Sequence, residues 1–335
     1  MSIRGVENPV TIGEGDTPLI PVPRLAEWAA PGAALYVKFE GLNPTGSFKD
    51  RGMTAAVTEA RADGARALLC ASTGNTAASA AAYAARAGMG CTVVIPDSDV
   101  ALGKLAGALA YGAKVVTVRG NFDDALRLSR EAGEAEGVAL VNSVNPARLE
   151  GQKTAAWEVT EQLGAVPHVV ALPVGNAGNL TSYWMGFCDQ MRMKTPWMLG
   201  VQAAGSAPLV HGAEVDHPIT RATAIKIGRP ARGEQAKAAI AESNGMILAA
   251  TDEEIFAAWR EVARREGIFC EPSSAAGIAG LRIASQSGAL ATEGLSIVLV
   301  LTGHGLKDAA AVLDEMPPPI LIEPRTDHLL REMGL

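Results

Sequence analysis

The chain has 335 residues, 48% of them hydrophobic and 19% charged, which is the composition of a globular protein with one large core or two smaller ones. Its formal net charge of −7 and the lack of a basic run argue against a nucleic acid or a membrane surface as partner. The four cysteines are scattered without a CxxC pair, which predicts reduced thiols and a cytoplasmic protein.

Short apolar runs alternate with longer alanine-rich runs along the chain. Strands are predicted at Leu35–Phe39, Ala67–Cys70, Cys91–Ile95, Lys114–Val118, Ala139–Asn142, His168–Pro173, Met198–Gln202 and Ser296–Leu301. Helices are predicted at Met53–Gly64, Thr76–Gly88, Ala101–Gly112, Phe122–Glu136 and Leu149–Gly164. This alternation, with continuously apolar strands, predicts an α/β fold of parallel sheets covered by helices. From the residues alone, Ala147–Gln152 is the candidate domain boundary.

Two uncharged stretches, Ala67–Ala85 and Val169–Cys188, are nearly long enough to cross a bilayer. Both contain Gly, Asn, Ser and Thr at a density that a spanning helix would find costly. The first residues also lack the apolar segment of a signal peptide. We therefore interpret the two stretches as buried strand–turn–helix segments. Because ligands of α/β sheets bind beyond the carboxyl ends of strands, the loops that directly follow strands are the candidate sites.

The first such loop lies in GLNPTGSFKDRG, Gly41–Gly52. A phosphate-binding P-loop has its lysine directly after the second glycine, whereas here two residues separate that glycine from Lys49. A helix is predicted to begin at this point, and its positive end favours a neutral lysine amine. Such an amine is a nucleophile suited to Schiff-base formation. Taken alone, a solvated lysine beside Asp50 and Arg51 is the simpler interpretation.

The second loop opens the run ASTGNTAASAAAYAARAG, Ala71–Gly88. Its polar residues are Ser72, Thr73, Asn75 and Thr76. Backbone N–H groups and small hydroxyls at a helix start can bind an anion such as a carboxylate. Ordinary helix capping would account for one such residue, but less well for the whole run.

The third and fourth loops follow two later strands. In PVGNAGNL, Pro173–Leu180, Gly175 and Gly178 allow the close backbone approach that a phosphate cup needs, although glycine loops also serve as plain turns. In LTGHGLKD, Leu301–Asp308, a threonine hydroxyl could bond a heteroaromatic nitrogen. A lone histidine in a glycine turn, such as His304, is more often structural than catalytic.

Together these loops describe a site for pyridoxal 5′-phosphate, and the chain resembles the threonine synthases among the fold-type II pyridoxal-phosphate enzymes. The matching runs are GLNPTGSFKDRGM, LCASTGNTAASAAAYAARAG, LVNSVNPARLEGQKTAAWE, LPVGNAGN and LTGHGLKD, which occur in family order. The resemblance implies conversion of O-phospho-L-homoserine and water to L-threonine and phosphate by γ-elimination and β-hydration. It also implies a homodimer.

The resemblance assigns roles to individual residues. Lys49 would form the covalent link to the cofactor and move protons, Asn75 would meet the ring oxygen, and Thr302 would face the pyridine nitrogen. The cofactor phosphate would be wrapped by Gly175, Asn176, Ala177, Gly178 and Asn179. The substrate carboxylate would be lined by Ser72, Thr73 and Thr76, and the substrate phosphate held by Asn142, Ser143 and Arg148, with Lys153 and Lys226 as weaker candidates. No catalytic role falls to His304.

The implied fold resembles the tryptophan synthase β chain, with two open parallel-sheet, three-layer domains. Residues 43–145 would form the smaller domain, and residues 1–42 plus 146–335 the larger one that carries the cofactor phosphate loop. One alternative is a threonine or serine dehydratase, or another β-replacement enzyme, on the same fold, and another is a non-catalytic carrier or sensor of the cofactor. A metal hydrolase is weaker, because the five histidines form no HExxH motif, and no metal is expected.

Overall fold

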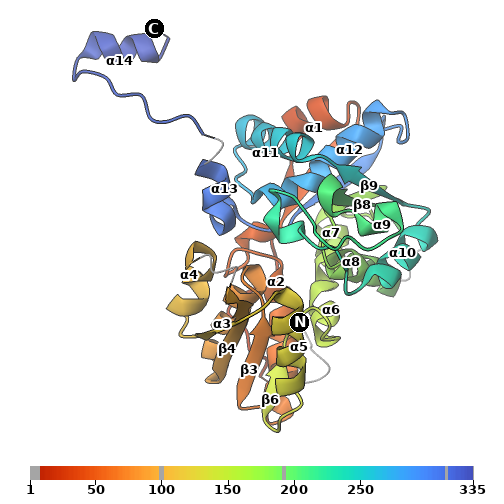
Figure 1. Cartoon of the computed structure of the whole chain (residues 1–335). Helices are drawn as coiled ribbons and strands as arrows, with labels where there is room; N and C mark the ends of the chain where they lie inside the picture. The colour runs from red at the N-terminus through yellow and green to blue at the C-terminus, as the bar shows by residue number, and fades with distance from the viewer. Residues whose placement is uncertain (1–7, 98–101, 191–193, 314–315, 335) are drawn as a thin grey trace.

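Two separate β-sheets organise the protein (Figure 1). The structure is a computed structural model that describes residues 8–97, 102–190, 194–313 and 316–334. Within these residues, one sheet has six strands in the order β1-β2-β10-β7-β8-β9, and the other has four in the order β5-β4-β3-β6. All neighbouring strands described are parallel except β1 and β2, which are antiparallel. The predicted α/β fold class is confirmed.

The six-stranded sheet is buried between two layers of helices. Its strands are β1 (Leu19–Pro21), β2 (Ala34–Phe39), β7 (Val169–Pro173), β8 (Trp197–Ala203), β9 (Met246–Ala250) and β10 (Ser296–Leu301). One face is covered by α1 (Pro23–Ala29), α11 (Asp252–Glu266) and α12 (Ala276–Gln286), and the other by α7 (Thr154–Leu163), α8 (Gly178–Asp189) and α10 (Gly233–Glu242).

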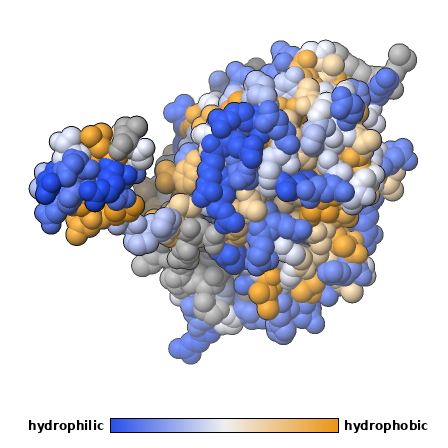
Figure 2. All heavy atoms as spheres, turned by 90° about the horizontal axis from the view of Figure 1, so that it is seen from above, coloured by the Kyte–Doolittle hydropathy of each residue, from blue (hydrophilic) through white to orange (hydrophobic). Residues whose placement is uncertain are grey.

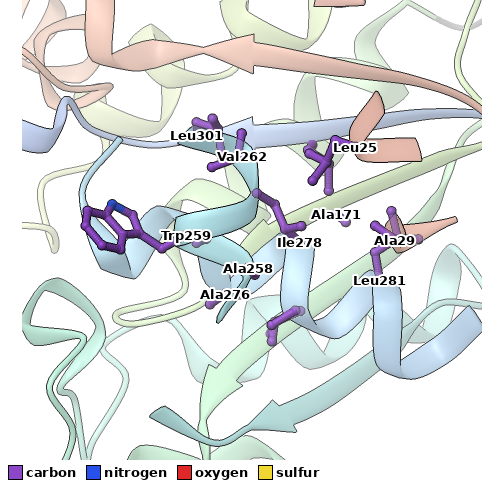
Figure 3. Packing of buried hydrophobic residues seen from close by; sticks show 14 of the residues in the cluster. Leu25, Ala29, Ala171, Ala258, Trp259, Val262, Ala276, Ile278, Leu281 and Leu301 are labelled. Atoms are coloured by element: carbon purple, nitrogen blue, oxygen red, sulfur yellow. The ribbon is translucent and has the colours of Figure 1, made fainter. Parts of the chain in front are cut away.

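Alternation along β10 shows why this strand is apolar throughout. Ile297, Leu299 and Leu301 pack with α1, α11 and α12, whereas Val298 and Val300 point into the core on the opposite face. Figure 3 shows the first of these cores, where side chains from α1, α11 and α12 meet beside the sheet. Both faces of a central parallel strand must therefore be apolar.

The four-stranded sheet is built in the same way. Its strands are β3 (Ala67–Ala71), β4 (Gly90–Pro96), β5 (Lys114–Val118) and β6 (Val138–Leu140). Helices α2 (Lys49–Ala62), α3 (Asn75–Ala87) and α4 (Leu102–Ala110) cover one face, and α5 (Phe122–Ala132) packs on the other. The limits of 43 and 145 for a smaller domain remain a prediction.

Helix α6 (Ala147–Gln152) follows β6 and crosses α2 at very short range. A Cβ added to Gly151 would lie 1.9 Å from the carbonyl oxygen of Arg51, and one added to Gly52 would lie 2.8 Å from that of Arg148. Glycine is thus required on both helices, at Gly52 and Gly151. The absence of side chains at these two positions allows α6 to pack directly against the first turn of α2.

The remaining elements are short. They are the helices α9 (Pro208–His211), α13 (Ala309–Leu313) and α14 (Thr326–Glu332), and the 3-10 helices η1 (Glu40–Leu42), η3 (Ala204–Ser206), η4 (Thr223–Ile225), η5 (Pro272–Ala275) and η6 (Gly305–Asp308). Helix α14 stands apart from the body of the molecule (Figures 1 and 2) and contains no buried residue. None of the helices in the described part of the chain has both the length and the apolar character that a membrane span requires.

One expectation about the elements needs correction, and two strands were missed. Strands β1 and β9 were not predicted, and the single helix predicted at Leu149–Gly164 is two helices, α6 and α7. Strand β1 ends in Pro21 and lies at the edge of its sheet, where proline costs no ladder hydrogen bond. The run Met246–Ala250 is short and evenly apolar, so its periodicity does not distinguish a strand from a buried helical segment.

Candidate active site

All the candidate loops lie at the carboxyl ends of neighbouring strands. Strands β2, β10 and β7 are adjacent in the larger sheet and lead into the loops that carry Lys49, Thr302 and Gly175, respectively. Strands β3 and β6 are adjacent in the smaller sheet and lead into the loops of Ser72 and Asn142. In parallel sheets these ends form one edge, which is where ligands bind in α/β proteins.

The loop before Lys49 is pinned to the loop after β10. The Phe48 N–H donates to the carbonyl of Thr302 at 3.0 Å, and the His304 N–H donates to the carbonyl of Gly46 at 2.9 Å. Gly46 has a φ of +85°, which explains a glycine at this turn. The two loops therefore place Lys49, in the first turn of α2, beside Thr302.

Asp50 fixes the same turn from the other side. Its buried carboxylate accepts hydrogen bonds from the Thr45 N–H at 2.7 Å, the Thr45 hydroxyl at 2.6 Å and the Ser79 hydroxyl at 2.6 Å. It thus ties the loop to both α2 and α3, and Lys49 is held in a set position at the junction of the two sheets.

The Lys49 amine has an unusually low pKa. Its pKa is lowered from 10.5 to about 7, mainly by burial and then by the nearby positive charge of Arg148, while Glu271 and Cys70 act in the opposite direction. A large fraction of this amine is therefore neutral at pH 7, which a nucleophilic role requires and which the solvated lysine of the simpler interpretation would not show.

A buried carboxylate that the sequence analysis did not identify connects two candidate ring partners. Glu271 is only 3% exposed. Its Oε2 accepts from Asn75 Nδ2 at 3.0 Å, and its Oε1 accepts from the Thr302 hydroxyl at 3.2 Å. Asn75 begins α3 and Thr302 follows β10, so the two sheets meet on this carboxylate. No strand was predicted before Glu271, so Glu271 did not lie in a loop that was considered as a candidate site.

The loop Pro173–Asn179 has the features of an anion cup. Ala177 adopts a φ of +65°, which is unusual for a residue other than glycine, and it precedes α8 without a side-chain cap on that helix. The buried Asn179 Nδ2 has no hydrogen-bond partner in the described part of the chain. A helix N-terminus with unused donors favours a phosphate.

Arg148 is the second candidate anion partner. It is 1% exposed, its Nη1 donates to the Val141 carbonyl at 3.2 Å, and its Nε has no partner among the described residues. No carboxylate pairs with it in that part of the chain. Its pKa is lowered to about 10, mainly by burial, with Cys70 acting in the opposite direction and the positive charge of Arg232 lowering the pKa as well. An unpaired buried guanidinium is costly unless an anion binds it.

Two neighbouring predicted phosphate partners are held by backbone contacts. Asn142 accepts from the Ala71 N–H and donates to the Ala71 carbonyl, both at 2.9 Å, which leaves one amide N–H available. The Ser143 carbonyl accepts from Arg232 Nε at 3.3 Å. Arg232 was not identified from the sequence. Its backbone N–H donates to the Asn176 carbonyl, so it joins the two candidate anion sites.

The polar residues around the start of α3 are partly buried, as a ligand-lining position requires. Ser72, Thr73 and Thr76 lie at the carboxyl end of β3, and the Ser72 hydroxyl accepts from the Gly74 N–H at 3.3 Å. No side chain caps α3. Simple capping therefore does not account for this run, and its proposed role toward a carboxylate stays a prediction.

Three other candidates have different surroundings. Lys153 Nζ pairs with Glu150 and Asp189, both at 2.7 Å, and Lys226 is exposed. The His304 ring accepts from the Leu306 N–H at 3.2 Å and thereby caps η6. These contacts give Lys153 and His304 structural roles.

Comparisons with known proteins agree on one family. A family model described as pyridoxal-phosphate dependent enzyme matches residues 10–303. The chain is 55% identical over 332 residues to the threonine synthase of Mycobacterium leprae (strain TN), covering 98% of this chain and 91% of that protein.

Solved structures agree on the fold. A threonine deaminase from T.th. has a TM-score of 0.74 and 27% identity, covering 90% of this chain and 97% of its own. A serine racemase from maize has a TM-score of 0.80 at 19% identity, covering 99% and 98%, which is a likeness of fold alone.

Proposed function

Because this chain belongs to the threonine synthases, within the pyridoxal-phosphate dependent enzymes, we propose that it converts O-phospho-L-homoserine and water to L-threonine and phosphate. The observation that carries this proposal is the pair of separate anion sites. One is the cup at Gly175–Asn179, and the other is Arg148, a buried guanidinium that no carboxylate of the described residues pairs with. A cofactor with one phosphate and a substrate with another need two such sites.

The cofactor is pyridoxal 5′-phosphate. The residues present suit it: a lysine with a pKa of about 7, a helix N-terminus without a side-chain cap, and a buried amide nitrogen with no partner in the described chain. Lys49 would carry the cofactor, residues 175–179 would hold its phosphate, and Asn75 and Thr302 would meet its ring. When bound, the cofactor stabilises the negative charge that develops as a proton leaves the substrate α-carbon.

Lys49 is the proton carrier in this proposal. Its free amine would take a proton from the substrate α-carbon, give that proton up, and then take one from the β-carbon. A pKa near neutrality suits a group that must both accept and return protons at pH 7. Phosphate leaves from the γ-carbon, water adds at the β-carbon, and the last protonation gives threonine.

Arg148 would bind the leaving phosphate, and Ser72, Thr73 and Thr76 would hold the substrate carboxylate. A planar guanidinium forms two parallel hydrogen bonds to phosphate oxygens, which fixes the γ-carbon relative to Lys49. The burial of Arg148 strengthens this contact, because water competes less for the phosphate. Asn142 and Ser143 would complete the phosphate site.

The test is NMR of the products formed when the protein, with its cofactor, is incubated with O-phospho-L-homoserine. Threonine and phosphate in equal amounts support the proposal. An untouched substrate with the cofactor still linked to Lys49 would contradict the substrate assignment. Turnover by Lys49→Ala at the normal rate would contradict the role of that lysine.

A dehydratase on the same fold is the second candidate, favoured by the likeness to a threonine deaminase at 27% identity. Such an enzyme needs no second phosphate site, so the buried Arg148 speaks against it. Release of 2-oxobutyrate from threonine as the main activity would decide for the dehydratase.

The homodimer and the cytoplasmic location are also proposals. Support for the dimer comes from exposed apolar side chains of the C-terminal segment, among them Leu321 (96% exposed) and Leu329 (51%). Support for the cytoplasm comes from the free thiols of the four cysteines.

A further inference from the structure

Glu271 has no part in the function proposed above, yet it contacts two residues assigned to the cofactor ring. Its carboxyl oxygens bond Asn75 Nδ2 at 3.0 Å and the Thr302 hydroxyl at 3.2 Å. Space is kept for this carboxyl group, since a Cβ on Gly303 would lie 2.6 Å from both Cδ and Oε1 of Glu271. A buried carboxylate with two such partners has a defined orientation.

The hydrogen atoms around Thr302 can be counted. The Ser274 oxygen accepts a hydrogen bond from the Gly303 N–H at 3.0 Å. The Ser274 hydroxyl proton is therefore available to donate to Thr302 Oγ1, which is 2.8 Å away. Thr302 then has one proton, which it donates to Glu271 Oε1 at 3.2 Å. In this arrangement its oxygen keeps one acceptor position, which can accept a hydrogen bond from a donor group on a ligand.

We propose that Glu271 is a positioning residue that acts on the pyridine nitrogen of the cofactor through the Thr302 hydroxyl, so that carboxylate and nitrogen share one proton. The inference rests on the proposed placement of the ring against Thr302. With Glu271 ionised, the Thr302 oxygen accepts from a protonated ring nitrogen. With the proton on Glu271, the carboxyl group donates to Thr302, and the Thr302 proton turns to an unprotonated nitrogen. The two arrangements contain the same atoms and differ only in where the protons lie.

The surroundings of Glu271 make both arrangements accessible. Burial raises the pKa of Glu271, the hydrogen bonds from Asn75 and Thr302 lower it, and the charge of Asp308 raises it while that of Lys307 lowers it. Lys49 is the other charged group that faces this carboxyl group, from α2. The ring of His304 packs against Phe39 and Phe269.

A hydroxyl beside the nitrogen, without a carboxylate behind it, would leave the nitrogen unprotonated. The hydrogen bond from Thr302 to Glu271 allows the ring nitrogen to be protonated, while the negative charge lies on Glu271, behind Thr302. The consequence is a stronger electron sink than Thr302 alone would provide.

The test uses the full-length protein loaded with pyridoxal phosphate labelled with ¹⁵N in the ring, without substrate. In Glu271→Gln, the side-chain oxygen still accepts from Asn75 while its amide donates permanently to Thr302, so the Thr302 proton is directed to the ring nitrogen. We expect the ring ¹⁵N resonance to move from the protonated toward the unprotonated pyridine position. The control Glu242→Gln removes an exposed carboxylate on α10 and should leave the resonance unchanged.

Two results would overturn the proposal. One is a Glu271→Gln resonance identical to that of the wild type, and the other is a wild-type resonance already at the unprotonated position, which needs no variant at all. A double-mutant cycle adds specificity, since Glu271→Gln should have no further effect once Thr302→Val has removed the hydroxyl. The readout involves no turnover. A cofactor-loaded protein that makes no threonine would therefore contradict the proposed function. The ¹⁵N spectra would still test the role of Glu271.

Discussion

At the scale of single residues, burial gives Lys49 its chemistry. An exposed lysine would be protonated almost completely at pH 7, whereas the pKa of Lys49 is lowered to about 7, first by burial and then by the charge of Arg148. Because the protonated amine is disfavoured in the folded state, the neutral nucleophile is present before any ligand binds. The cofactor therefore does not have to deprotonate the residue that will carry it.

We predict that the rate at which the cofactor-free protein links pyridoxal at Lys49 rises with pH through about 7, not through the ordinary value of 10.5. Only the neutral amine attacks, so the rate follows the fraction of Lys49 that has lost its proton. Pyridoxal without its phosphate is used, so that binding to the 175–179 cup does not contribute. Stopped-flow absorbance between pH 5.5 and 9.5 gives the midpoint.

Arg148→Gln should move that midpoint upward, because it removes a positive charge that disfavours the protonated amine. The matched control is Arg127→Gln, which changes an exposed arginine on α5. A midpoint near 10 in the wild-type protein would show that Lys49 is solvated after all.

The sequence identified the residues that directly follow predicted strands, because that position has a physical meaning in a parallel sheet. Lys49, Asn75 and Thr302 all lie in or at the end of loops that follow strands, and the structure brings them together at the edge where the two sheets meet. Glu271 and Arg232 follow no strand that the sequence revealed. Each is recognisable only from contacts between segments far apart in the chain.

At the scale of elements, the start of α2 depends on an ion network that no local pattern predicted. Arg51 is 1% exposed and bonds Glu40 at 2.6 Å and Glu158 at 2.5 Å, while Lys38 bonds Glu158 at 2.7 Å. Two positive and two negative groups thus balance within the core. The network joins α2 to β2 and α7, so the helix that carries Lys49 is fixed to the larger sheet.

We predict that Arg51→Leu lowers the free energy of unfolding of the cofactor-free protein by about 3–5 kcal/mol, because Glu40 and Glu158 lose their guanidinium partner and only the positive charge of Lys38 remains against two carboxylates. Urea denaturation followed by circular dichroism measures the change. Arg127→Leu, which removes an exposed pair with Glu131, should have little effect. Equal effects of the two variants would show that burial of the network does not matter.

Arg232 joins two loops that would otherwise move independently. Its side chain donates to the carbonyls of Ser143 at 3.3 Å and Val144 at 2.8 Å, while its backbone N–H bonds Asn176. We predict that Arg232→Met raises the KM for O-phospho-L-homoserine by roughly ten-fold or more, with a smaller change in kcat, since hydrogen bonds from charged groups contribute about 1.5–3 kcal/mol. Steady-state kinetics of phosphate release measures both.

The control for Arg232 lies in the same segment. Arg229 is exposed and pairs with Glu214 and Asp216, so Arg229→Met should leave KM close to the wild-type value. An unchanged KM in Arg232→Met would exclude a role for this residue in holding the phosphate loops.

At the scale of the whole molecule, the alternation of strands and helices was sufficient to predict parallel sheets and their buried faces. It could not predict which strands share a sheet. Strand β10, near the end of the chain, lies between β2 and β7, and this places the Thr302 loop between the loops of Lys49 and Gly175. The site is therefore a consequence of long-range strand order, which periodicity does not encode.

The C-terminal segment gives the last prediction at this scale. Helix α14 has seven residues and no buried side chain, and a helix of that length is not stable alone in water. Exposed apolar residues lie on the helix and on either side of it, among them Ile320 (72% exposed), Leu321 (96%), Leu329 (51%) and Met333 (59%). Figure 2 shows hydrophobic residues, in orange, on the part that projects from the body. Such a surface is expected to pack against another chain.

We predict that a chain ending at Leu313 has a dimer dissociation constant at least ten-fold weaker than that of the full chain, because the apolar side chains of residues 320–333 no longer pack against the second copy. Sedimentation velocity over a concentration series measures both constants. Leu329→Asp with Leu330→Asp should weaken the dimer in the same direction, whereas Ile219→Asp, at an exposed site elsewhere, should not. A truncated chain that dimerises as tightly as the full chain would show that the segment has another partner, and a full chain that stays monomeric would contradict the proposed homodimer itself.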